Sequence, residues 1–341
     1  MRSLHRKKFC SMQHNRRKKM EKSRKGALQS FRELKKGENS TQITMLIAFV
    51  VMFVLFSTQS GTFYSLSNIL NVLRQNSALF LIACGQTYVI MLAGIDLSQG
   101  NLVGLCSVIS SYAMLRFGFG AGLLAGLLVS VLCGAVTGTI IVKGKVQPFV
   151  AALGMQFIIY GVNLLISGGN PVYNLPEAVS WIGSASVLGI PVSILIAFVV
   201  GMAAHILLKK STFGRGMYAV GGNNQAAHLS GISVKRTIIK AWLLNGVLIG
   251  VGSMILMSRV GSGQPALGGA EIQMQSIAAA VVGGNSFDGG KGSISATLIG
   301  ALFIAFLING LNILGLNQFV REVIMGAVII LSVIKKGKAE S

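Results

Sequence analysis

The succession of apolar runs constrains this chain more than any other feature of its sequence. Ten mostly apolar stretches follow one another, centred near residues 50, 84, 108, 132, 157, 200, 247, 278, 303 and 327. A helix needs roughly 20 such residues to cross the hydrocarbon core of a bilayer. The chain is 52% hydrophobic and 11% charged, which is more apolar than one soluble core of this size requires. The expected fold is an all-α integral membrane protein, a polytopic bundle of about ten transmembrane helices.

The distribution of basic residues predicts the orientation of these helices. Residues 1–42 contain 14 Lys or Arg, three Glu and no sustained apolar run. Because positive charge stays on the cytoplasmic side, this basic tail is expected in the cytoplasm, where it either only enforces topology or also binds anionic membrane lipid. Residues 43–335 then form the transmembrane domain, and 336–341 a second cytoplasmic tail. With ten spans, the short basic connections share the same side: 142–146, 209–216, 234–236 and 335–338.

Two glycine-rich interruptions separate neighbouring apolar runs. GIDLSQG (94–100) aligns with GNSFDGG (284–290), and both indicate helices that are discontinuous, near 94–100 and 284–292. A carboxylate in the bilayer costs at least roughly 2.5 to 3.5 kcal/mol, so Asp96 must face protein, backbone donors or a water-filled path. It either anchors the start of the next helix or lines the path. The residues expected along the translocation path or its gate are Asp96, Ser98, Asn101, Asn285 and Ser286.

The longest polar connection, residues 211–237, contains the pattern of a short helix outside the membrane. Asn223 is suited to cap its start and Gly231 to end it. The two alanines between them would let this helix sit closely in a groove of another protein, although a solvated connector fits the same pattern. The residues assigned to that contact are Gly222, Asn223, Ala226, Ala227, Leu229, Ser230 and Gly231.

Several classes of protein fit the sequence poorly. The four histidines and four cysteines have neither metal-site nor catalytic-triad spacing, so no metal ligand, catalytic residue or bound cofactor is expected in this chain. The net charge of +21 is not interleaved with stacking aromatic residues, which argues against nucleic acid as a partner. An ion-coupled secondary transporter stays open as an alternative, but only Asp96 and Asp288 supply carboxylates near the breaks.

Four segments in fixed order carry a family resemblance: GIDLSQGNLVG, VQPFVAALGM (146–155), GRGMYAVGGNNQAAHLSGISV (214–234) and IAAAVVGGNSFDGGKGS (277–293). Together they resemble the permease subunit of ribose-type ATP-binding-cassette importers, over about residues 43 to 335. Membership implies a bacterial inner-membrane permease that translocates a monosaccharide such as ribose, or a related hydroxylated solute, by alternating access. The helix near 223–231 would then resemble the coupling helix that the ATPase receives.

The same resemblance implies the partners of the chain. These are a cytoplasmic ATP-binding subunit with two fused nucleotide-binding halves, which holds ATP and Mg²⁺, a periplasmic or lipid-anchored solute-binding protein, and a second permease copy, identical or related. The sequence departs from the family pattern at Asn224 and Gln225, where acidic residues are common. Gln273 and Gln275 are further departures, and they leave the identity of the sugar open.

Overall fold

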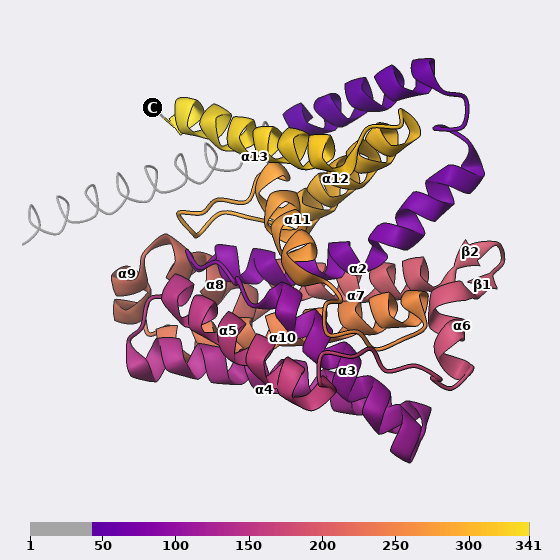
Figure 1. Ribbon diagram of the computed structural model, residues 1–341. Helices are drawn as coiled ribbons and strands as arrows, with labels where there is room; N and C mark the ends of the chain where they lie inside the picture. Colours follow the sequence, from indigo (N-terminus) through magenta and orange to yellow (C-terminus); the bar gives the residue numbers. More distant parts are fainter. Residues whose placement is uncertain (1–42, 341) are drawn as a thin grey trace, which may run out of the picture. The chain divides into compact units, whose positions relative to one another are not determined.

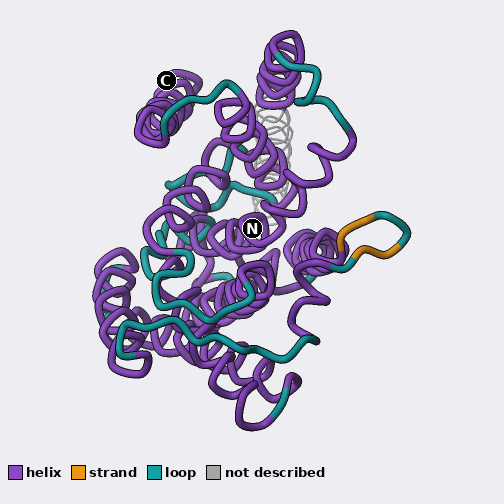
Figure 2. Tube along the Cα trace, turned by 45° about the vertical axis from the view of Figure 1, so that its right-hand side comes forward, coloured by secondary structure: helices purple, strands orange, loops and turns teal. Residues whose placement is uncertain are grey.

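The computed structural model describes residues 43–340, and apart from one short hairpin its regular elements are helices (Figure 2). Backbone contacts separate Met1–Thr44 from a compact unit that starts at Met45. The elements are Ile43–Gln59, α2 (Leu66–Ile90), α3 (Gln99–Phe117), α4 (Phe119–Gly144), α5 (Pro148–Ser167), α6 (Ala178–Ser184), β1 (Ser186–Val187), β2 (Ile190–Pro191), α7 (Val192–Lys210), α8 (Thr212–Gly222), α9 (Asn224–Leu229), α10 (Val234–Val260), α11 (Gly269–Val282), α12 (Ile294–Ile313) and α13 (Gln318–Glu340). The predicted basic tail, residues 1–42, lies outside the described residues.

Each of the ten predicted centres falls within a helix, and the polytopic helical fold is confirmed. Among the described residues, α4, α5, α7, α10 and α12 are long and apolar enough to cross a membrane by themselves. With its 14 residues, α11 rises only about 21 Å, which is less than the roughly 30 Å hydrocarbon core. The chain that leads into it packs against α3, since a Cβ atom at Gly100 or Gly104 would collide with the carbonyl oxygens of Gly269 and Pro265.

Helix α2 is the centre of the bundle. It packs against α7, α10, α11 and α12, and nearly every side chain from Ser77 to Ile90 is buried (Figure 1). Buried apolar residues on both sides of α2 form the main core, together with residues of α3, α7 and α10. From Ser77 to Ile90 the helix is almost completely enclosed by its neighbours, which explains why apolar residues lie all around this part of it.

Small residues allow α4 and α10 to approach closely, as the four-residue spacing of their glycines predicts. Gly134 lies against the backbone of Trp242, and Gly246 lies against the backbone of Ser130. A Cβ atom at either glycine would clash with main-chain atoms of the other helix. The two helices consequently form the most extensive helix pair of the bundle.

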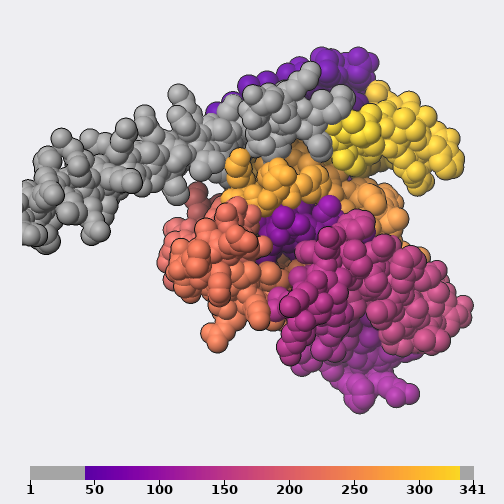
Figure 3. All heavy atoms as spheres, turned by 90° about the vertical axis from the view of Figure 1, so that its left-hand side faces the viewer, coloured from indigo at the N-terminus to yellow at the C-terminus, as the bar shows by residue number. Residues whose placement is uncertain are grey.

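The ends of α7 carry different structures. The hairpin of β1 and β2 precedes α7, whereas α8 and α9 follow it at the opposite end (Figure 1). The sequence did not predict α8, because its four glycines lower helix propensity. Ser211 caps it by accepting a 2.9 Å hydrogen bond from the amide of Gly214, and its apolar side, with Met217 and Val220, is buried. Viewed from this end, the α8–α9 segment lies at the molecular surface (Figure 3).

Candidate functional site

The first break separates α2 from α3 and contains the buried Asp96. The chain leaves the helical path after Ile90, with Ala93 at a φ of 56°. One carboxylate oxygen of Asp96, Oδ1, accepts from the backbone amide of Ser98 at 2.8 Å and from its hydroxyl at 2.6 Å. Since α3 begins at the next residue, these bonds fix the geometry with which the chain enters that helix. Asp96 is thus positioned as the helix-start anchor that the sequence suggested.

A chain of hydrogen-bonded side chains continues from Asp96 into two further helices. Asn245 of α10 donates to Asp96 Oδ2 at 2.6 Å, and Gln99 of α3 donates to Asn245 Oδ1 at 2.9 Å. Gln99 Oε1 in turn accepts from the hydroxyl of Ser276 on α11 at 2.7 Å. All four residues are at most 2% exposed. The first break is therefore joined by polar side chains to α10 and α11.

Sequence reasoning missed Asn245, Gln99 and Ser276. Asn245 is a lone amide in the apolar run LLNGV, which is the one signal that could have identified it, since polar residues in a span need a partner. Its partner could not be inferred, because Asp96 lies 149 residues away in the sequence. Gly85 of α2 faces Asn245 so closely that a Cβ atom there would collide with the amide oxygen.

The second break, between α11 and α12, is closed around Asn285. The Asn285 amide nitrogen donates to the carbonyl of Ala280 at 2.7 Å and to the hydroxyl of Thr297 at 2.8 Å, while Oδ1 accepts from the amide of Ser293 at 2.8 Å. One side chain thereby holds the end of α11 to the start of α12. Thr297 also shares a 2.6 Å hydrogen bond with Thr87 of α2, which ties this break to the central helix.

The two breaks meet each other and α8, at a contact that we name the glycine junction: Met91, Tyr218, Gly221, Gly290 and Gly292. The amide of Gly290 donates to the carbonyl of Met91 at 2.9 Å, and the Tyr218 hydroxyl donates to the carbonyl of Gly292 at 2.7 Å. A Cβ atom at Gly221 would collide with the backbone of Met91 and Gly290. Glycine is required here because three segments of main chain touch one another.

The five predicted path residues do not form one cluster. Asp96 and Ser98 are bonded to each other in the first break, and Asn285 and Ser286 are neighbours in the second. Asn101 instead donates to the carbonyl of Gln156 on α5, at 3.2 Å. The two breaks, which resemble each other in sequence, also contact each other at the glycine junction.

The short helix near 223–231 is present as α9, with the predicted ends. Asn223 accepts a 2.9 Å hydrogen bond from the amide of Ala226, and Gly231 ends the segment at a φ of 81°. The surface assigned to a partner needs one correction. Ala227 is 3% exposed, because it packs against its own chain, whereas Ala226 is exposed and Leu229 is 87% exposed. The outward surface of α9 therefore includes Ala226 and Leu229, together with the polar residues of the helix, but not Ala227.

Hydrogen bonds among side chains and main chain hold the two breaks in place. Among the described residues, no three His, Cys, Asp or Glu side chains come together as a metal site. The buried groups at the breaks are a carboxylate, amides, hydroxyls and main chain, which can exchange hydrogen bonds with water or with the hydroxyls of a solute.

Comparison with known proteins identifies the class. Residues 68–333 match the family described as branched-chain amino acid transport system / permease component. The chain is 38% identical to the ribose import permease protein of Escherichia coli K12, over 86% of this chain and 93% of the relative. It is also 38% identical to the ribose import permease protein of Haemophilus influenzae (84% and 90% covered) and 35% identical to the D-allose transport system permease protein of Escherichia coli K12 (85% and 89%).

These matches and the polytopic helical fold define a transport subunit without catalytic function, the permease of an ATP-binding-cassette importer. The chain belongs to the family of branched-chain amino acid transport system / permease components. Permeases of this family operate with an ATPase and a solute-binding protein, and the relatives in the comparison are bacterial.

Proposed function

We propose that this chain is the permease of a monosaccharide importer and translocates a pentose or hexose such as ribose by alternating access. The support is that relatives named for ribose and for D-allose match nearly their full length, at 35 to 38% identity. The family description names branched-chain amino acids, so leucine is the second candidate solute. The Asp96 carboxylate is already bonded to Ser98 and Asn245, and the amides and hydroxyls around it suit a hydroxylated, uncharged solute.

An uptake experiment separates the two solutes. The permease is expressed with its ATPase and binding protein in a host that lacks its own ribose and leucine uptake, and accumulation of labelled D-ribose, D-allose and L-leucine is measured. We expect accumulation of a sugar that unlabelled leucine does not reduce. Accumulation of leucine alone would assign the chain to amino-acid transport, and accumulation without the ATPase would favour the ion-coupled alternative.

The proposed assembly contains two permeases, identical or related, a cytoplasmic ATPase with two fused nucleotide-binding halves that holds ATP and Mg²⁺, and a periplasmic or lipid-anchored binding protein. The proposed location is the bacterial inner membrane, with both termini in the cytoplasm. This orientation is supported by the basic connections, since it places α8, α9 and the lysines at the end of α7 on the cytoplasmic side.

In the proposed mechanism the two breaks are the gate and α9 receives the ATPase. Asp96, Ser98, Asn285 and Ser286 hold the breaks closed, and Asn101 keeps α3 against α5 while they move. The ATPase contacts Ala226 and Leu229. The ends of α9 are shaped by Asn223, Ser230 and Gly231, and Gly222 joins α9 to α8. A displacement of α8 then reaches both breaks, because Tyr218 and Gly221 touch the main chain of the second break and of Met91.

A further inference from the structure

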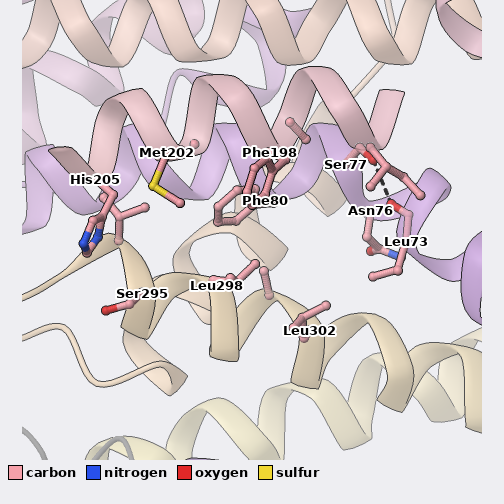
Figure 4. Close-up of a pocket in the computed structure, with 15 residues that line it drawn as sticks. Leu73, Asn76, Ser77, Phe80, Phe198, Met202, His205, Ser295, Leu298 and Leu302 are labelled. Carbon is pink, nitrogen blue, oxygen red and sulfur yellow. Dashed lines mark hydrogen bonds between the residues drawn. The ribbon is translucent and has the colours of Figure 1, made fainter. Parts of the chain in front are cut away.

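A lateral cavity of about 310 Å³ lies between α2, α7 and α12, and one end of it reaches the start of α12, directly after the second break (Figure 4). Phe80 of α2, Phe198 and Met202 of α7, and Leu298 and Leu302 of α12 line it. Phe198, Met202 and Leu298 are 62%, 43% and 41% exposed, so the cavity is open to the outside of the bundle along its length. It is therefore a groove in the membrane-facing surface rather than an internal chamber.

The groove presents hydrocarbon to its contents, even where its lining includes polar residues. Asn76 donates to the carbonyl of Val72 at 2.9 Å, and Ser77 donates to the carbonyl of Leu73 at 2.8 Å. Both side chains are thus bonded to the backbone of their own helix, and Figure 4 shows them at one end of the groove. His205 and Ser295 lie at the other end, so the length between the two ends is lined by apolar residues and suits an apolar occupant better than a sugar.

The length of the groove matches one leaflet of a bilayer. Its lining on α7 extends from Ile194 to His205. At 1.5 Å per residue, these positions are separated by about 16 Å along the helix axis. One leaflet accounts for half of the hydrocarbon core, or roughly 15 Å. An acyl chain that enters at the His205 end can therefore run along the whole groove.

Positive charge lies beyond that end and nowhere else on α7. The exposed Lys209 and Lys210 follow His205 by one turn of α7 and end the helix. If an acyl chain occupied the groove, the headgroup of that lipid would lie at this end of α7. Basic groups at the mouth of a groove between transmembrane helices favour anionic headgroups.

We propose that this groove binds an anionic phospholipid, with one acyl chain between α2, α7 and α12 and its phosphate beside Lys209 and Lys210. A helix of a second permease copy would also cover apolar surface, but it would leave both lysines without a counter-charge. A phospholipid matches the length, the hydrocarbon lining and the charged end together. The site is independent of the solute, and it holds α7 and α12 at a fixed separation.

The test counts lipids on the purified full-length permease. Native mass spectrometry in detergent, with added phosphatidylglycerol or phosphatidylcholine, is applied to the wild type, to Leu298→Trp, which fills the groove, and to Lys209→Gln/Lys210→Gln. Leu165→Trp on α5, at an 86% exposed position, and Lys143→Gln/Lys145→Gln at the end of α4 are the matched controls.

We expect wild type and controls to retain one phosphatidylglycerol that Leu298→Trp lacks. Removal of the lysines should lower the preference for phosphatidylglycerol over phosphatidylcholine by about fivefold for each charge. Equal retention by Leu298→Trp and wild type, or an unchanged preference without the lysines, would overturn the proposal. Loss of the permease dimer in Leu298→Trp, without loss of lipid, would assign the groove to a second copy. A melting curve of each variant shows that its fold is intact.

Discussion

Replacement of Gly85 by alanine should break the polar chain at Asp96 without altering any polar residue. The added Cβ atom would collide with the Asn245 amide oxygen, so we expect the Asn245 side chain to rotate away from both of its partners. Two bonds are lost, from Asn245 to Asp96 and from Gln99 to Asn245. Side-chain hydrogen bonds within membranes contribute about 0.6 kcal/mol on average and up to about 1.7. The expected cost is therefore about 1 to 3 kcal/mol of unfolding free energy.

The same reasoning predicts strong coupling between Gly85→Ala and Asn245→Ala. Asn245→Ala by itself removes both bonds and leaves a small void. Once the amide is gone, the added methyl group at Gly85 meets only main-chain atoms of Asn245, at 3.3 Å and beyond, which a small shift accommodates. The double variant should therefore be about as stable as Asn245→Ala. The interaction energy of the cycle, which is the departure from additive costs, should cancel most of the cost of Gly85→Ala.

Buried cysteines provide the assay for this cycle. Cys84 and Cys106 are at most 1% exposed, so a thiol-reactive fluorophore reaches them when the bundle unfolds. Cys10, which lies outside the described residues, and the partly exposed Cys133 are replaced by serine in every variant. Gly154→Ala on α5 is the control, because its added methyl group meets no atom within 4 Å. Additive costs, or a Gly85→Ala variant as stable as Gly154→Ala, would refute the proposed steric mechanism.

Two further predictions concern the proposed contact with the ATPase. Leu229→Glu should reduce co-purification of the ATPase and abolish uptake with an unchanged melting temperature, because Leu229 is 87% exposed. The matched change Leu188→Glu, at the 98% exposed turn of the hairpin, should leave co-purification and uptake intact. Equal behaviour of the two variants would contradict docking at α9. Tyr218→Phe should retain the ATPase but lower uptake several-fold, because one hydrogen bond of the glycine junction is lost. The control Tyr160→Phe, on the exposed side of α5, should transport normally. Normal uptake by Tyr218→Phe would contradict transmission through the junction.

The sequence predicted the helices and both breaks because these features are local. Apolar runs, the interruptions after Ile90 and Val282, and the ends of α9 each depend on residues within a few positions of one another. Pattern and capping rules are sufficient at that range. The helix α8 was missed because burial of Met217 and Val220 offsets its poor intrinsic propensity, and propensity is the part that the sequence displays.

The tertiary contacts of the site were not predictable in the same way. Periodicity shows which face of a helix is polar, but it does not show which other helix that face meets. The contact between Asn245 and Asp96, and that between Tyr218 and Gly292, join residues 149 and 74 positions apart. The burial of Ala227 follows the same logic, because alanine suits the interior of its own chain as well as the groove of a partner.

The strength of the contacts at the breaks is appropriate for a gate that a partner opens. To move a two-state equilibrium from 1:99 to 99:1, the partner must supply roughly 5.5 kcal/mol of differential binding. The glycine junction is closed by two hydrogen bonds between segments, and Asn285 adds its bonds across the second break. At about 0.6 to 1.7 kcal/mol each within a membrane, these bonds total only a few kcal/mol. Buried ion pairs in their place would hold the breaks more strongly, since separating such a pair costs about 3 to 5 kcal/mol. At the second break and the glycine junction, amides, hydroxyls and glycine backbone therefore keep the closure within the energy that docking of a partner can supply.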